Sequence, residues 1–363
     1  MIPNCISRAV GLLFGAVLVI FLLVPIVSEL LTGRQSTHSS ARTAYAMYPQ
    51  EKPPLSGVRP SLPEPDDPEE LANLEDLIHQ QKYQQAEPMV RTYLAAHPAS
   101  WKACYFLAYL LFHERQLEES VKYVSKSLAM HNDDPGAHNL LGKCLTIVGR
   151  YAMAETEFVE AARLAPDYSE AHYNLARVHS IRDDFPRAKT EFEIALKLNP
   201  NYMEAYNGLG FALEALGDDK AALADYQEAI RLNEERGGNF DAPYVNLSGF
   251  YNRRNQLDLA LEYAHKALAL NPQSDLAYFQ ISKTCRTQLD WNGVVEALQK
   301  AISLRPKSSY YYILSTAYRK LGRSKESEDA LAKFKEIENQ ASELEEKMRE
   351  TRRATSGLEL RPQ

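Results

Sequence analysis

Two consecutive blocks of 34 residues share one pattern: PGAHNLLGKCLTIVGRYAMAETEFVEAARLAPDY at 135–168 and SEAHYNLARVHSIRDDFPRAKTEFEIALKLNPNY at 169–202. Each block holds a small residue in its first half, Gly142 or Ala176, and spaced alanines in its second half. A proline stands near the end of each block, where it stops a helix. Self-similarity at this period predicts a helix pair that must stack on copies of itself to bury its apolar face.

The shared positions resemble the tetratricopeptide repeat family, whose pattern runs from a Leu-Gly pair through an aromatic residue, Ala, Phe, Ala and a closing Pro. The first block matches it with Leu141, Gly142, Tyr151, Ala154, Phe158, Ala161 and Pro166. The resemblance covers roughly residues 67–341. It implies an all-α, right-handed solenoid of about eight helix-turn-helix repeats that binds other proteins.

The repeats are expected near 67–100, 101–134, 135–168, 169–202, 203–240, 241–274, 275–307 and 308–341. In the middle six, small residues occupy the sites where helices should approach closely: Ala108, Gly142, Ala176, Gly210, Ser248 and Ser282 on first helices, and Ser127, Ala161, Ala195, Ala229, Ala267 and Ala301 on second helices. Larger residues, Leu74, Tyr93 and Phe334, replace them in the two end units. Atypical end units are expected of caps.

The N-terminus predicts a membrane anchor. After a short tail (1–8), residues 9–28 carry no charge, and fourteen of these twenty are Val, Ile, Leu or Phe. Such a run is long enough to span a bilayer, so we expect one transmembrane signal-anchor helix at 9–31 that precedes the solenoid. A cleaved signal peptide is the alternative, but no small-x-small cleavage site lies close behind the run.

A flexible, proline-rich linker is expected at 32–66, because seven prolines fall between Pro49 and Pro68 and nothing there is periodic. The apolar run predicts a single-pass membrane protein, and in layout the chain resembles the membrane-anchored tetratricopeptide regulators of bacterial lipopolysaccharide assembly, which implies a bacterial inner membrane. Basic residues flank the anchor almost equally, so they do not orient it. The stalk-like linker favours repeats outside the cytoplasm, whereas three unpaired thiols favour a reducing compartment.

Two irregularities interrupt the repeat. The fifth unit contains extra residues around Gly237-Gly238, which we interpret as a tolerated loop insertion or, alternatively, a flexible joint. The C-terminal extension and tail (342–363) begins with a predicted helix running to about residue 353. A stripe along this helix (Leu331, Phe334, Ile337, Ala341, Leu344 and Met348) predicts a cover for the last repeat or a homo-oligomer contact.

Composition and motifs exclude several functions. The formal net charge of −7 argues against nucleic-acid binding, which needs a basic surface. Cys104, Cys144 and Cys285 form no C-x-x-C pair, so we expect buried, small apolar side chains and no metal site. No phosphate loop, metalloprotease or nucleophile motif occurs. We therefore expect a non-enzyme without cofactors.

In tetratricopeptide proteins the concave face is built mainly from first-helix residues at repeat positions two, five, nine, twelve and thirteen. The resemblance therefore implies that the partner-binding residues are Lys102, Tyr105, Tyr109, His113, Lys143, Tyr173, Arg177, Phe211, Arg253, Phe279, Lys283, Arg286, Tyr312 and Arg319, together with the recurring amides Asn139, Asn174, Asn207 and Asn246. Aromatic and arginine side chains suit peptide recognition. Chaperone-binding tetratricopeptide proteins hold the chaperone C-terminus with a set of Lys, Arg and Asn side chains from three adjacent repeats. No three adjacent repeats of this chain carry that set, so we do not expect a chaperone C-terminus as the ligand.

The predicted function is a membrane-tethered scaffold that binds a partner protein or extended peptide, in envelope assembly, secretion or biogenesis. The alternative is a non-catalytic regulatory subunit that positions a partner enzyme at the membrane. A pull-down distinguishes the two, because only the second predicts a stably co-purifying enzyme.

Overall fold

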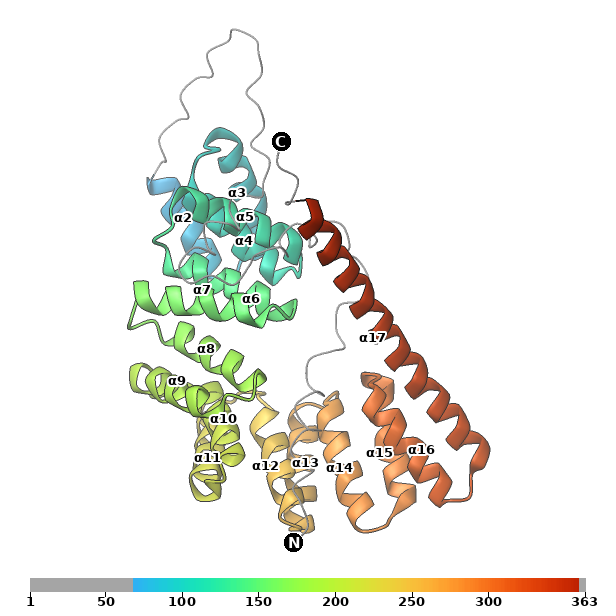
Figure 1. Ribbon diagram of the computed structural model, residues 1–363. Helices are drawn as coiled ribbons and strands as arrows, with labels where there is room; N and C mark the ends of the chain where they lie inside the picture. Colours follow the sequence, from blue (N-terminus) through green and yellow to red (C-terminus); the bar gives the residue numbers. More distant parts are fainter. Residues whose placement is uncertain (1–67, 359–363) are drawn as a thin grey trace. The chain divides into compact units, whose positions relative to one another are not determined.

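The computed structural model describes residues 68–358, and within this range it contains helices and no strands (Figure 1). The prediction of an all-α repeat fold is confirmed. The expected anchor and linker lie outside the described residues. Among the described helices, none combines the length and apolar character needed to cross a membrane.

The described residues form two compact units, which we call the N-terminal unit (68–174) and the C-terminal unit (175–347). The boundary falls within α8. The helices of the N-terminal unit are α2 (Pro68–His79), α3 (Tyr83–Ala96), α4 (Trp101–His113), α5 (Leu117–Met130), α6 (Pro135–Ile147), α7 (Tyr151–Leu164) and the start of α8 (Ser169–Ile181). Even-numbered helices are the first members of each pair, and odd-numbered helices are the second.

The C-terminal unit continues the same alternation. Its helices are the rest of α8, α9 (Phe185–Leu198), α10 (Met203–Ala215), α11 (Asp219–Glu235), α12 (Ala242–Arg253), α13 (Leu257–Leu270), α14 (Asp275–Thr287), α15 (Trp291–Leu304), α16 (Ser308–Lys320) and, as far as Lys347, α17 (Ser324–Leu358). Asp184, Asp218 and Asp290 start three of the second helices by accepting a backbone N–H of the first turn.

The helix pairs pack through the predicted small residues, which are all buried. At three glycines an aromatic ring of a second helix lies directly on the first-helix backbone. A Cβ on Gly142 would stand 2.6 Å from Phe158, and one on Gly208 would stand 2.3 Å from Phe192. Residue size at these sites therefore sets the distance between the helices.

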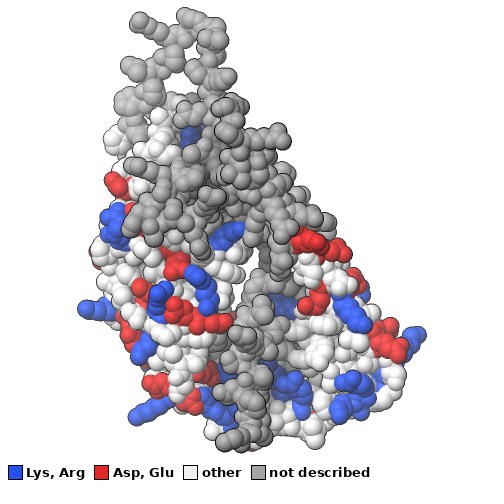
Figure 2. Space-filling model, viewed as in Figure 1, with Lys and Arg blue, Asp and Glu red and all other residues white. Residues whose placement is uncertain are grey.

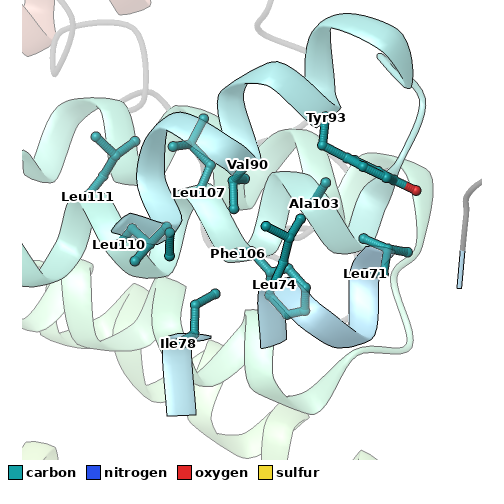
Figure 3. Packing of buried hydrophobic residues seen from close by; sticks show 11 residues of the cluster. Leu71, Leu74, Ile78, Val90, Tyr93, Ala103, Phe106, Leu107, Leu110 and Leu111 are labelled. Carbon is teal, nitrogen blue, oxygen red and sulfur yellow. The ribbon is translucent and has the colours of Figure 1, made fainter. Parts of the chain in front are cut away.

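The first repeat differs from the others as expected of a cap. Leu74 and Tyr93 fill the sites that hold small residues elsewhere, and both are fully buried. They join Leu71, Val90 and Phe106 in one apolar cluster that spans α2, α3 and α4 (Figure 3). Large side chains here build an apolar core between α2, α3 and α4 in place of the close backbone contacts of the later repeats.

The insertion in the fifth unit is mostly helix, which corrects the expectation of a longer loop. Helix α11 has 17 residues, whereas α9 has 14, because no proline ends it early. The turn that follows is fixed by Asn233, whose buried Oδ1 accepts the Phe240 N–H at 3.1 Å. Gly238 is required there, since a Cβ would lie 2.4 Å from that oxygen.

At the C-terminus, α17 continues to Leu358, beyond the predicted end. Leu331, Phe334, Ile337 and Ala341 are partly buried along it. The side chains of Leu344 and Met348, which complete the predicted stripe, lie outside the described part.

The turn inside each helix pair contains one residue with left-handed φ. In chain order these residues are Gln81, Arg115, Gly149, Asp183, Gly217, Asn255, Leu289 and Gly322. The conformation lets the next N–H reach back to the first helix, as when Asp290 N donates to Cys285 O at 2.9 Å. Four of the five non-glycine members have polar or charged side chains, and Leu289 is the apolar one; its Cβ disfavours the φ of 61°, and its side chain has no polar group that could bond to the backbone in return.

Replacing Leu289 with glycine is expected to stabilise the protein by about 1 kcal/mol, since the left-handed strain is relieved and a side chain that is 69% exposed loses little packing. Urea denaturation measures the change. The control is Gln288→Gly, at φ −77°, which should lose about 0.5–1 kcal/mol. If both glycines destabilise the protein equally, strain at Leu289 is not the cause.

Candidate functional site

The predicted partner-binding residues lie on the first helices of the two units, and their exposure differs widely. Two are buried, Asn139 and Asn174. Nine are partly buried: Lys102, Tyr105, Tyr109, Lys143, Tyr173, Asn207, Asn246, Phe279 and Lys283. Seven are exposed: His113, Arg177, Phe211, Arg253, Arg286, Tyr312 and Arg319.

In the N-terminal unit, aromatic rings of α3 and α4 form one cluster. The Tyr109 ring centroid lies 4.5 Å from that of His113 and 6.4 Å from that of Tyr105. Tyr83, which the sequence analysis missed, joins it at 4.8 Å from His113. Burial, followed by a hydrogen bond to Tyr83, raises the pKa of Tyr109 to about 12, so this hydroxyl stays neutral.

The same cluster discourages positive charge on His113. Burial lowers its pKa below the ordinary value, and the nearby cations of Lys143 and Arg115 lower it further. A neutral imidazole beside tyrosine rings offers apolar contact area with hydrogen-bonding edges, which is the chemistry of peptide recognition.

Consecutive first helices of the N-terminal unit are joined by ion pairs between repeat positions nine and two. Lys102 Nζ donates to Glu75 at 2.7 Å, and Lys143 Nζ donates to Glu170 at 3.0 Å. Each pair joins residues 27 positions apart, with the charges reversed between them. Both pairs are partly exposed, so they contribute only about 1 kcal/mol or less each, but they neutralise this face.

The recurring amides bind each other across neighbouring first helices. Asn174 Nδ2 donates to Asn139 Oδ1 at 3.0 Å, and Asn246 Nδ2 donates to Asn207 Oδ1 at 2.8 Å. Asn139 also donates to the Tyr168 hydroxyl at 3.0 Å. These amides therefore hold first helices together, and a bound peptide would have to compete with them.

In the C-terminal unit, charges on α10 and α12 are paired. Arg253 binds Glu214 through two N–H groups at 2.8 and 2.7 Å, and Arg254 reaches the same carboxylate at 3.0 Å. Arg254 also binds Asp219 and lies 3.4 Å from the centroid of the Phe250 ring. Sequence reasoning missed Arg254, because it follows the last residue of α12.

Helix α14 carries two cations, Lys283 and Arg286, that differ from Arg253 of α12 in their lack of a carboxylate partner among the described residues. Lys283 Nζ lies 4.6 Å from the centre of the Phe279 ring, and its neighbouring charges are Arg253 and Arg286. Burial, followed by the repulsion of these two arginines, lowers the pKa of Lys283 to about 8. Within the described residues neither Lys283 nor Arg286 has an ion-pair partner.

Two large aromatic side chains on the first helices are exposed. Phe211 of α10 is 39% exposed and meets Phe185 edge-on at 5.9 Å, whereas Tyr312 of α16 is 55% exposed and lies 5.5 Å from Phe334. On the visible face, acidic and basic side chains are interspersed (Figure 2). The first helices thus present aromatic contact area among mixed charges.

The described residues form neither a metal-binding group nor a reactive thiol site. No group of three His, Cys, Asp or Glu side chains there is placed to hold a metal ion. The thiols of Cys104, Cys144 and Cys285 are buried, as expected, and burial raises the pKa of Cys144 to about 11. These thiols are poor nucleophiles at neutral pH.

Three segments, residues 77–144, 182–237 and 308–340, match sequence profiles of the tetratricopeptide repeat. The chain therefore contains these repeats. No curated protein sequence matches it.

Several solved structures share the fold. A tetratricopeptide repeat protein from Parabacteroides merdae is 15% identical, with a TM-score of 0.56 over 69% of this chain and 97% of that one. A chain of the APC/C hetero-tetramer Cut9-Hcn1 is 14% identical, with a TM-score of 0.59. The match covers 77% of the present chain and 55% of the Cut9-Hcn1 chain. PilF from Pseudomonas aeruginosa is 21% identical, with a TM-score of 0.50, and the match covers 61% of the present chain and 96% of PilF. At these identities the likeness shows the fold alone. Proteins built from such repeats generally mediate protein–protein interaction.

Proposed function

We propose that this tetratricopeptide repeat protein is a non-catalytic scaffold that binds a partner protein, or an extended segment of one, on the first helices. The observation that carries the proposal is the exposure of Phe211 and Tyr312 on first helices. Exposed aromatic and arginine side chains supply large contact areas with little loss of entropy, and they dominate binding energy at interfaces.

The proposal includes a membrane tether at residues 9–31, joined to the repeats by the linker at 32–66. Support comes from the uncharged apolar run of the sequence. A tether would confine binding to the membrane surface and raise the effective concentration for partners there. Envelope assembly, secretion or biogenesis is the process that we propose for it, on the outer side of a bacterial inner membrane. Labelling engineered surface cysteines from outside intact cells tests the orientation.

The scaffold role is tested by quantitative pull-down with the full-length chain. We expect the Phe211→Ala/Tyr312→Ala variant to retain its specific partner at least about tenfold less tightly, because removing two interface aromatics costs more than 1.4 kcal/mol. The matched control is Val159→Ala/Leu259→Ala, which removes equally exposed apolar side chains from second helices.

Equal loss in both variants would contradict a first-helix site, and so would a partner whose retention neither variant changes. Thermal melting of each variant checks that the repeats remain folded. A stably retained enzyme would identify the bound partner as catalytic and favour the regulatory-subunit alternative.

A further inference from the structure

Lys283 and Lys143 occupy the same place in two different repeats. Each is the ninth residue of a thirteen-residue first helix, α14 for Lys283 and α6 for Lys143. Each also lies over an aromatic ring, at 4.6 Å from the centre of Phe279 and 5.1 Å from that of Phe112. The two lysines therefore share their position in the first helix, and each lies over an aromatic ring, from its own helix for Lys283 and from α4 for Lys143.

Their electrostatic surroundings differ. The partner of Lys143 is Glu170, the second residue of the next first helix, α8. The second residue of α16, the first helix that follows α14, is Ser309. The carboxylate that neutralises Lys143 thus has no counterpart beside Lys283.

Other carboxylates do not replace it. Asp275, on the same helix as Lys283, is bound to Lys307 and Tyr310, both at 2.6 Å. Glu214 is bound by Arg253 and Arg254. The charged groups that act on the pKa of Lys283 are the cations Arg253 and Arg286, and both lower it.

Charges arranged in this way are costly for the isolated protein. A partly buried ammonium group is destabilised by lost hydration and by repulsion from two guanidinium groups, of which only Arg253 has a carboxylate partner in the described part of the chain. A bound anion would offset both the repulsion and the lost hydration, since it supplies opposite charge and hydrogen-bond acceptors at close range. The Lys143–Glu170 ion pair shows that a carboxylate can lie beside a lysine at this position of a first helix.

We infer that Lys283, with Arg286 of the same helix, binds a carboxylate of the partner segment in the place that Glu170 takes beside Lys143. The inference rests on the proposed function, because it names the chemistry of the ligand at part of the first-helix face. A protein carboxylate fits the site better than a phosphate-rich polymer, given the net charge of −7 of the chain.

The test uses the full-length chain and fluorescein-labelled hexaglutamate, with binding followed by fluorescence anisotropy. Ser309→Glu supplies the missing carboxylate from within and should weaken hexaglutamate binding at least about tenfold. Ser309→Gln has the same size without charge and should leave binding unchanged. Lys283→Gln should weaken binding to a similar extent. Glu170→Ser, which unpairs Lys143, should strengthen it.

Two further peptides identify the source of the carboxylate. Hexaglutamate with an amidated C-terminus binds if side-chain carboxylates are recognised, and hexaglutamine with a free C-terminus binds if the chain terminus is recognised. The inference is overturned if no peptide binds, if Ser309→Glu and Ser309→Gln behave alike, or if only vesicles containing phosphatidylserine bind through Lys283. Should the aromatic variant lose its protein partner while Ser309→Glu keeps it, this inference fails and the scaffold proposal stands. Should hexaglutamate bind as expected while no specific protein partner is retained, the scaffold proposal fails instead.

Discussion

The Asp275→Ala variant is expected to lose about 3 kcal/mol of the free energy of unfolding. The Asp275 carboxylate is 8% exposed and accepts hydrogen bonds from Lys307 Nζ and the Tyr310 hydroxyl, both at 2.6 Å. Removing it leaves the buried Tyr310 hydroxyl without its acceptor and leaves the Lys307 ammonium with only the Tyr310 oxygen, 3.0 Å away. The Lys307 side chain is 22% exposed, so water can hydrate its ammonium group after the carboxylate is removed. We therefore expect a loss near the lower end of the range for breaking a buried ion pair, about 3–5 kcal/mol.

Urea denaturation of the full-length chain measures this loss, with hydrogen exchange of α14 and α16 amides locating it. Asp329→Ala, on the exposed face of α17, is the control and should change stability by less than about 0.5 kcal/mol. Because Asp275 and Lys307 interact directly, the Asp275→Ala/Lys307→Met double variant should be less destabilised than the sum of the single variants. Additive effects would show that the ion pair does not hold the loop before α16.

The polar contacts of the first helices were only partly predictable from the sequence. Asn139 and Asn174 were expected to face a peptide because amides recur along the repeats, but the structure pairs them with each other. Periodicity shows which helix face an amide occupies. It does not show whether a neighbouring helix or a ligand satisfies that amide, because this depends on helix spacing and rotamers.

The ion pairs between first helices, in contrast, were predictable from the sequence. The pairing of repeat positions nine and two, as in Lys143 and Glu170, could have been read from the sequence once the repeat boundaries were set. The exception at Lys283 and Ser309 is visible in the same way. What sequence alone could not provide was the partial burial of Lys283, because burial depends on how Phe279 and the arginines pack around it.

Backbone packing was the most predictable feature, since it depends on residue size at a fixed period. Ala108, Ala161 and Ser248 are buried where close approach was expected. The fifth repeat departed from expectation because the Gly237-Gly238 pair suggested a loop, whereas the helix-favouring residues before it extend α11. Local propensity decided that segment more than the repeat period did.

The importance of residue size is tested by the Gly142→Ala variant, which is expected to lose about 2 kcal/mol of stability. Alanine favours the helix interior by about 1 kcal/mol over glycine. Against this, its Cβ would lie 2.6, 2.8 and 2.9 Å from three atoms of the Phe158 ring, which is 1% exposed and has no room to retreat. Overpacking of a tight core costs up to about 3 kcal/mol, so the clash outweighs the helix propensity.

Two comparisons separate these opposing effects in urea denaturation. The Gly142→Ala/Phe158→Leu variant should be more stable than Gly142→Ala alone, because the smaller side chain makes room for the new methyl group. Gly249→Ala, in the interior of α12, meets only the flexible ends of Gln280 and Arg253, at 3.1 and 3.4 Å. It should therefore change stability by less than about 1 kcal/mol. If Gly142→Ala stabilises the protein, α6 and α7 can separate at little cost, and the small residues of the repeat do not set the helix spacing.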